Sequence, residues 1–238
     1  MFWIPQLKQR RRLPELMDQP DLDAAHHLHA LRGLERINRW SGSSRILWAP
    51  LRALAQAQST RPLRLLDVAS GGGDVPLSLW RKARQAGLPL LIEGGDLSPR
   101  AIAHARQKAE RLGAEVRFFQ LDALNSDLPA GYDVITCSLF LHHLDEDQAR
   151  ELLRRLEAAA GRLVLINDLR RSLGGFLLAY LGTRMLSTSH VVHFDGPISV
   201  AAAFTLEEVR QLATQAGLAG AVVQKRWPCR FLLSWRRP

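Results

Sequence analysis

Cysteine is scarce in this chain of 238 residues. Its two cysteines, Cys137 and Cys229, lie far apart, and neither has partners at the spacing of a metal site. This argues against a disulfide framework and against a zinc site. The stretches around residues 138 and 168 hold no carboxylate cluster, with Asn167 and Asp168 the only candidates, so we predict that the chain binds no metal. A reducing cytoplasm suits such a chain.

Long hydrophobic runs are also missing. One of the longest, residues 176–181, falls far short of the ~20 residues that a membrane-spanning helix needs. In the first residues, MFWIPQLKQRRR, the charges follow a very short apolar stretch, which is the reverse of a secretory signal. We therefore expect a soluble, cytoplasmic protein, or one that rests on a membrane surface.

Acidic residues are few in the two flanks of the chain. Residues 1–60 carry nine Lys/Arg against five Asp/Glu, and residues 170–238 carry nine against three. Residues 61–169 carry fourteen against fifteen. The net charge of +9 therefore belongs to the segments that surround a neutral central fold.

Alternating apolar runs are present from about residue 63 and alternate with helical patterns, which predicts a parallel sheet. The predicted strands are 63–69, 90–96, 116–122, 132–138 and 162–168. After Gly217, the runs 221–227 and 230–235 predict an antiparallel pair. The predicted fold class is α/β: a Rossmann-like doubly wound sheet, mostly parallel with a terminal antiparallel strand, plus N-terminal helices.

Helix boundaries are marked by capping residues. The predicted helix starts are Ser98 with Pro99, Asp145 with Gln148, and Thr205 with Glu208. Residues 1–60 are predicted to form an N-terminal helical extension, with one helix at 26–40, and residues 61–238 the main domain. Residues 172–200 look like its least regular part.

A glycine turn is the sharpest local signal. The run Leu65-Leu66-Asp67-Val68-Ala69 leads into Ser70-Gly71-Gly72-Gly73, and Pro76 then opens a helix. Glycine permits positive φ and close approach of a ligand to the backbone, and such turns bind ligands in doubly wound sheets. The alternative is an ordinary glycine-rich turn. A dinucleotide fingerprint needs a third glycine where Pro76 stands, which argues against NAD.

Acidic residues end the next two predicted strands. Asp96 follows Gly94-Gly95 and is placed to accept hydrogen bonds from both hydroxyls of a ribose. Asp122 ends the third strand, where a carboxylate can accept a hydrogen bond from the exocyclic amine of an adenine. Each acidic strand end is weak evidence alone, but these two together with Asp67, in register with the glycine turn, are much stronger.

These residues resemble the motif series of class I S-adenosylmethionine-dependent methyltransferases. The matching positions are 67–73, Asp96, Asp122-Ala123, 132–138 and the closing block 204–208. The resemblance covers roughly residues 60–235 and is nearest to the small-molecule branch that includes quinone-biosynthesis methyltransferases. Residues 20–23 and 36–40 also resemble methyltransferases associated with type III polyketide synthases.

The resemblance implies S-adenosylmethionine as the cofactor and assigns a role to each matching residue. Asp67 orders the glycine turn; Ala69, Gly71 and Gly73 line the methionine part; Asp96 holds the ribose; Leu97 packs on the adenine; Asp122 and Ala123 meet the adenine edge; Ser138 lies near the methyl donor. The family usually has glycine where Ala69 stands. We expect alanine to be tolerated there with a negative φ.

The implied reaction is O- or C-methylation of a small hydrophobic or aromatic acceptor, such as a phenol, a quinone precursor or a polyketide. An apolar stretch at 139–141 suits such an acceptor, and residues 172–200 are predicted to cover its site. A hydroxyl acceptor benefits from a nearby base, for which histidine is suited. His142 and His143 follow the fourth predicted strand, where the family binds its acceptors, and we take His143 and His193 as the catalytic candidates, with Asp195 to orient His193. The alternatives are that His143-Leu144-Asp145 is an ordinary cap on the following helix and that His193 is a surface histidine.

Two other functions stay open. The basic ends suggest an RNA methyltransferase, but the chain has no recognisable RNA-binding module and its middle is not basic, so nucleic acid is not the expected partner. A non-catalytic, cofactor-binding scaffold is the second alternative, because a fold does not fix a function.

Tryptophan and arginine gather in the flanks. The flanking tryptophans are Trp3, Trp40, Trp48, Trp227 and Trp235. With the cluster Arg10–Arg12 they predict weak peripheral contact with an anionic membrane. The alternative is that Trp40, Trp48 and Trp227 lie in the core or a pocket and that the arginines form a solvated face.

Overall fold

A seven-stranded sheet forms the centre of the computed structural model, which describes residues 7–19, 21–57 and 61–238. The strands are β1 (Leu63–Val68), β2 (Leu90–Asp96), β3 (Val116–Gln120), β4 (Tyr132–Ser138), β5 (Ala160–Leu169), β6 (Val222–Arg226) and β7 (Arg230–Arg236). Their order is β3-β2-β1-β4-β5-β7-β6, and β7 runs antiparallel to both its neighbours. The predicted α/β fold class is confirmed.

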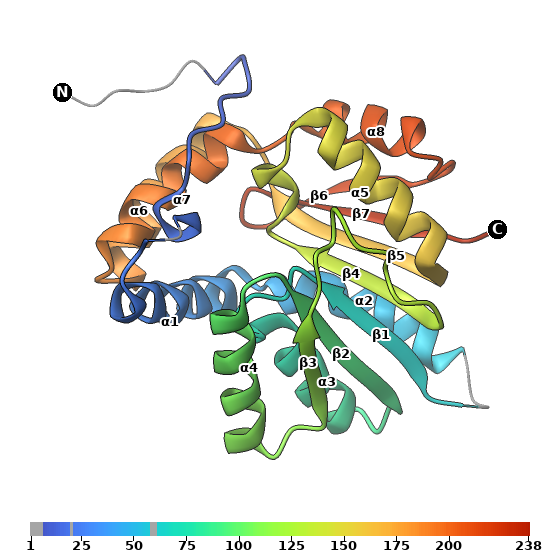
Figure 1. Ribbon diagram of the computed structural model, residues 1–238. Coiled ribbons are helices and arrows are strands. Elements are labelled where there is room, and N and C mark those ends of the chain that lie inside the picture. Colours follow the sequence, from blue (N-terminus) through green and yellow to red (C-terminus); the bar gives the residue numbers. More distant parts are fainter. Residues whose placement is uncertain (1–6, 20, 58–60) are drawn as a thin grey trace.

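Helices cover both faces of this sheet (Figure 1). They are α1 (Ala24–Ser41), α2 (Ser43–Gln56), α3 (Asp74–Gln85), α4 (Pro99–Leu112), α5 (Glu146–Ala159), α6 (Leu173–Leu186), α7 (His190–Ala202) and α8 (Leu206–Gln215), with 3-10 turns η1 (Leu16–Asp18) and η2 (Leu141–His143). Apolar side chains of α2, α3 and α4 pack on one face, and those of α5 and α8 pack on the other. The core is therefore divided into two layers by the sheet.

The predicted helix starts are confirmed in atomic detail. Ser98 Oγ accepts a hydrogen bond from Ala101 N–H at the start of α4. Asp145 with Gln148 and Thr205 with Glu208 form complete capping boxes on α5 and α8. Each box satisfies backbone N–H groups that a helix start leaves without an intrahelical partner.

The prediction of an irregular segment at 172–200 is wrong. This segment holds α6 and most of α7, which pack against each other and against α1. Both helices are apolar around much of their circumference, because they contact each other, α1 and a cavity. The usual alternation of apolar and polar positions is therefore weak, and sequence periodicity does not reveal them.

The first described residues lie across α7. Arg11 N–H donates to the Ala201 carbonyl, and the backbone N–H groups of Leu16 and Met17 donate to Asp195. In Figure 1 this segment, α1, α6 and α7 lie together at one end of the sheet. That end is where the functional site is found. The boundary between a helical extension and the main domain at residue 60 stays a prediction.

Candidate functional site

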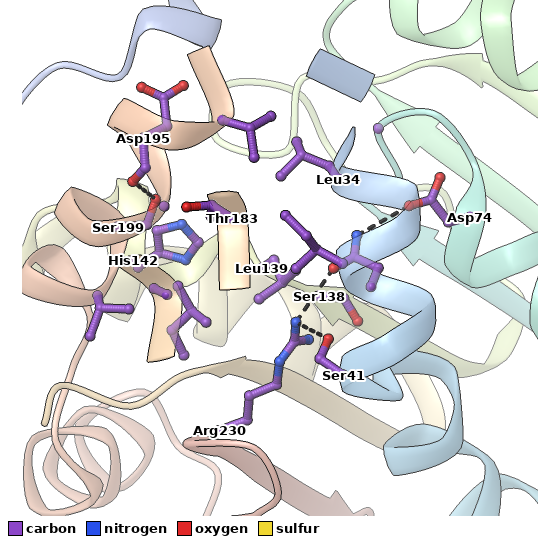
Figure 2. Close-up of a pocket in the computed structure, with 18 of the residues that line it drawn as sticks. Leu34, Ser41, Asp74, Ser138, Leu139, His142, Thr183, Asp195, Ser199 and Arg230 are labelled. Atoms are coloured by element: carbon purple, nitrogen blue, oxygen red, sulfur yellow. Dashed lines mark hydrogen bonds between the residues drawn. The ribbon is translucent and has the colours of Figure 1, made fainter. Parts of the chain in front are cut away.

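A cavity of about 270 Å³ opens at the carboxyl ends of β1 and β4 (Figure 2). The strand order reverses between these two strands, and this is the point at which open α/β sheets bind ligands. The glycine turn after β1 and the end of β4 form one wall of the cavity. Side chains of α1, α6 and α7 form the other, mostly apolar, wall.

The glycine turn has the strained geometry that its sequence predicts, with one correction. Gly71 has φ +52°, and a Cβ placed on it meets nothing within 4 Å. Gly73 has φ +78°, and a Cβ there comes within 2.9 Å of Phe118 and Ala105. Ala69 has φ +54°, so our expectation of a negative φ is wrong. A side chain in the left-handed region costs about 1–2 kcal/mol, which the packing around this turn must offset.

Backbone strain marks this cavity more widely. In the part of the chain that the structure describes, Ala69, Leu139 and Cys229 are the non-glycine residues with positive φ. All three line the cavity, although they follow or precede three different strands. Such strain tends to gather at functional sites, where the surroundings hold the backbone in place.

Asp67 lies under the turn and is 1% exposed. Thr136 Oγ1 donates a hydrogen bond to it from the neighbouring strand β4. Burial raises the pKa of Asp67 to about 7, with smaller contributions from the charges of Asp96 and Asp74, while the Thr136 hydrogen bond opposes the rise. Asp67 thus lines the cavity and is bonded to β4, and its ordering of the turn stays a prediction.

Asp96 joins the glycine turn to the start of α4. Its carboxylate accepts hydrogen bonds from Gly71 N–H at 2.7 Å and from Ser98 N–H at 2.9 Å. The next residue, Leu97, is 59% exposed, which is unusual for leucine and leaves an apolar surface beside the turn. These two residues lie at the same sheet edge as the cavity but are not among its lining residues.

Asp122 and Ala123 follow β3 at the same edge. The Asp122 carboxylate accepts hydrogen bonds from Leu124 N–H and from the backbone and side chain of Asn125. The Asn125 side-chain hydrogen bond is the main cause of a lowered Asp122 pKa. Asp122 therefore organises its own turn, and it lies outside the cavity lining, as do Ala123 and Gly73.

Ser138 ends β4 and lines the cavity. Its Oγ is buried and has no hydrogen-bond partner among the described residues. Asn167, its register neighbour on β5, is fully buried, and both polar atoms of its amide also lack partners there. Buried polar groups in this state call for a ligand or an ordered water.

His142 and His143 lie at the cavity, in η2. His142 is 4% exposed, and its Nδ1 lies 2.7 Å from Asp168 Oδ1. Burial alone would raise the pKa of Asp168, but its interactions with His142 bring that pKa below the ordinary value. Because an ionised carboxylate only accepts, Nδ1 carries the proton and Nε2 is the basic nitrogen. The structure thus favours His142, rather than His143 alone, as the oriented base.

His193 is placed differently from our expectation. Its Nε2 lies 2.7 Å from the Ser187 carbonyl, and His193 is not among the residues that line the cavity. Asp195 does line it, and its carboxylate holds the backbone N–H groups of Leu16 and Met17. A catalytic role for His193 gains no support from these contacts.

Sequence reasoning missed Glu15, Asp74 and Arg230, which all line the cavity. Glu15 Oε1 accepts a hydrogen bond from Ser199 and lies 3.7 Å from His142 Nε2 and 3.9 Å from His143 Nδ1. These ligand-type atoms lie within 4.8 Å of one another, so the prediction that no metal binds stays a prediction. Glu15 carried no signal, because it lies outside every motif and reaches the cavity only through tertiary contacts.

Comparison with known proteins agrees with this geometry. A family profile described as "Methyltransferase domain" matches residues 65–160, from β1 to the start of β5. The chain has the class I methyltransferase fold, and residues 65–160 are a methyltransferase domain.

Curated relatives of this methyltransferase domain include enzymes of quinone biosynthesis. A demethylmenaquinone methyltransferase of Thermus thermophilus is 39% identical over 131 residues, which cover 54% of this chain and 58% of the relative. A ubiquinone biosynthesis O-methyltransferase of Paraburkholderia phytofirmans is 29% identical over 125 residues, which cover 52% and 51%. The chain thus spans about half the length of the curated relatives it matches.

Solved structures share the fold over more of the chain. The plantazolicin methyltransferase BpumL, in complex with SAH, superposes with a TM-score of 0.63 at 19% identity and covers 92% of this chain and 90% of its own. At this identity the likeness shows the fold alone.

Proposed function

We propose that the chain transfers the methyl group of S-adenosylmethionine to a small, apolar or aromatic acceptor. One observation carries this proposal: a single cavity has the glycine turn of a methyltransferase domain on one wall and an apolar helical wall opposite. Cofactor and acceptor would meet between the two walls. When bound, the sulfonium of the cofactor supplies an electrophilic methyl group, and the protein contributes mainly positioning.

The residues around the glycine turn fit this cofactor. Ala69 and Gly71 line the cavity beside Ser138, whose buried hydroxyl has no protein partner. Asp96 stands next to the turn to accept the ribose hydroxyls, and exposed Leu97 offers an apolar face for the adenine. Gly73, Asp122 and Ala123 would shape this edge, with Asp67 supporting the turn from below.

The opposite wall fits a hydrophobic acceptor. It includes Leu31, Leu34 and Ile37 of α1, with Leu178 of α6 and Val192 of α7. Phenols, quinone precursors and polyketides have this character, and the relatives named above act in quinone biosynthesis. His142, oriented by Asp168, is placed to hold the proton of a hydroxyl acceptor.

Cofactor binding is tested by titration calorimetry with S-adenosylhomocysteine. Asp96→Ala should weaken binding by at least ten-fold, because two ribose hydrogen bonds lose a charged acceptor worth about 1.5–3 kcal/mol each. Asp127→Ala, which removes an exposed loop carboxylate, is the matched control and should bind as the unaltered protein does. Equal affinity for both variants would remove Asp96 from the cofactor site.

Catalysis is tested with radiolabelled S-adenosylmethionine and separate phenol, quinone-precursor, RNA and protein fractions. Label should enter the small-molecule fractions; label in RNA would favour an RNA methyltransferase, and none anywhere would favour a scaffold. His142→Ala should lower kcat for a hydroxyl acceptor while leaving S-adenosylhomocysteine affinity intact. His143→Ala and His193→Ala run beside it, and unchanged turnover in all three would mean that positioning alone suffices.

We further propose that the protein contacts an anionic membrane through α6. Leu173, Leu177, Leu181 and Met185 recur every fourth residue and are 46–84% exposed, which forms an apolar stripe along this helix. Arg184 lies in the same helix and stacks on Tyr180. Such a stripe beside the acceptor wall would let an apolar acceptor enter from lipid. Among the described residues, no helix is both long and apolar enough to span a bilayer.

Two arginines of the cluster expected to bind the membrane, Arg10 and Arg12, contact protein groups instead. The Arg10 side chain donates to the carbonyls of Ala202, His142 and Leu144 and stacks on Phe204. Arg12 lies 3.7 Å from Asp145. Of the tryptophans, Trp227 and Trp40 are well exposed, whereas Trp235 is buried and Trp48 packs against the core; Trp3 lies outside the described residues. The membrane proposal therefore rests on α6 and these two exposed rings.

A further inference from the structure

Arg230 is a buried cation at the edge of the cavity. It begins β7, is 2% exposed and is one of the residues lining the cavity. Figure 2 shows its guanidinium group pointing toward Ser41 at the end of α1. Removing a full charge from water costs several kcal/mol unless an opposite charge compensates for it.

The partners of Arg230 carry no charge. Its Nη2 donates to Ser41 Oγ at 2.6 Å and more weakly to Asn38 Oδ1 at 3.4 Å, and its Nη1 donates to Ser43 Oγ. Among the described residues, no carboxylate forms an ion pair with the guanidinium group, although the charge of Asp168 acts on it from further away. A guanidinium group has five N–H donors, so these three bonds leave donor capacity toward the cavity.

The carboxylates that share this region are held by other groups. Asp168 is bonded to His142, and Asp195 accepts the backbone N–H groups of Leu16 and Met17. Asp74 accepts from Asn38 and from Lys108. Burial lowers the pKa of Arg230 to about 10, the charge of Asp168 opposes this fall, and Arg230 stays charged at neutral pH.

Further unpaired polar groups stand at the same strand ends. Ser138 Oγ lines the cavity without a partner, and the Asn167 amide on β5 is fully buried without one, within the described part of the chain. Arg230 pairs with Leu169 of β5, which lies two residues after Asn167 on the same strand. Arg230 and the unpaired Ser138 hydroxyl thus line the same cavity, and the buried Asn167 amide lies next to Ser138 in the sheet.

We propose that Arg230 binds the carboxylate of a ligand in this cavity. A planar guanidinium group matches a carboxylate in a two-pronged hydrogen bond, and the ligand would supply the directly bonded charge that the described residues do not. This inference rests on the proposed function, under which two ligands can carry the carboxylate. One is an acceptor that has a carboxylate, and the other is the methionyl part of the cofactor. In either case Arg230 fixes the orientation of a molecule in the cavity.

Titration calorimetry on the full chain separates these sources. The first pair of probes is S-adenosylhomocysteine and its decarboxylated analogue, which keeps the amine. The second pair is 4-hydroxybenzoate and phenol, added to protein saturated with S-adenosylhomocysteine. In the pair that uses Arg230, the carboxylated member should bind about ten-fold more tightly or better, as expected for a charge-assisted hydrogen bond.

Arg230→Gln should abolish the preference for the carboxylated probe. Arg230→Lys should keep part of it, because lysine keeps the charge but cannot form the two-pronged hydrogen bond. Ser41→Ala with Ser43→Ala removes the neutral partners and keeps the charge, so it should retain the preference. Absence of a carboxylate preference in both pairs for the unaltered protein would overturn the proposal, whether or not the variants fold. Failure to bind S-adenosylhomocysteine or its analogue at all would instead count against the proposed function.

Discussion

Asp67 is a buried carboxyl whose ionisation opposes folding. Its pKa rises from an ordinary value near 3.8 to about 7 in the folded chain, chiefly through burial. A raised folded pKa means that the contribution of this group to stability is full below about pH 4. That contribution is lost as the pH rises toward 7, since the unfolded chain releases the proton first.

Asp67→Asn should therefore change the pH dependence of stability. Asparagine stays neutral and can still accept the Thr136 hydrogen bond. Relative to the unaltered protein, the variant should gain on the order of 2 kcal/mol between pH 5 and pH 8. Urea denaturation at both pH values measures this gain. Asp127→Asn, at an exposed loop position, should show no such gain, and parallel pH profiles for Asp67→Asn and the unaltered protein would contradict the prediction.

Ala69 offers a second test at a single residue. Glycine adopts φ +54° without the steric cost that alanine has there, although it also makes the unfolded chain more flexible. Ala69→Gly should leave stability unchanged or raise it by up to about 1 kcal/mol. Ala53→Gly, on the exposed side of α2, should lower it by about 1 kcal/mol. A similar loss in both variants, measured by urea denaturation, would show that the turn does not strain Ala69.

At the scale of elements, α6 and α7 meet through a glycine. A Cβ on Gly196 of α7 would lie 2.5 Å from Thr183 Cγ2 of α6, whereas a Cβ on Gly182 of α6 meets nothing within 4 Å. Gly196→Ala should separate the two helices and destabilise the protein by about 1–3 kcal/mol. Gly182→Ala should stabilise it by up to about 1 kcal/mol through helix propensity. Thermal unfolding of both variants checks the opposite signs; a stabilising Gly196→Ala would disprove the close contact.

Elements with their own local signals were predictable from sequence. The β2 and β4 boundaries agree with the expected ones, and both capping boxes lie where residue pairs at the helix starts place them. The α6–α7 hairpin was not predictable, because it is apolar on several faces and its order comes from contacts with α1 and the first described residues. The glycine turn was predictable because its sequence is a local signal. Glu15 and Arg230 were missed because only tertiary contacts bring them to the cavity.

At the scale of the whole molecule, the α6 stripe predicts salt-dependent association with anionic vesicles. Leu181→Glu should reduce co-sedimentation several-fold at low salt, because it places a charge in the apolar contact and repels anionic lipid. Leu112→Glu, at an exposed leucine of α4, is the matched control and should pellet as the unaltered protein does. Co-sedimentation that changes neither with salt nor with Leu181→Glu would exclude this membrane contact. If the protein is instead a dimer that Leu181→Glu dissociates, the stripe is a contact between two copies of the chain.

The wall of the cavity formed by α1, α6 and α7 lies wholly outside residues 65–160, while the glycine turn lies wholly inside them. The two walls thus come from separate stretches of sequence and are joined by contacts such as the hydrogen bond from Asn38 to Asp74. Substitutions in the helical wall would change the range of molecules that enter while the strand ends keep their sequence. The same division predicts the result of a graft. Replacing residues 7–41 and 170–204 together by the corresponding segments of a relative should give this protein the acceptor preference of that relative.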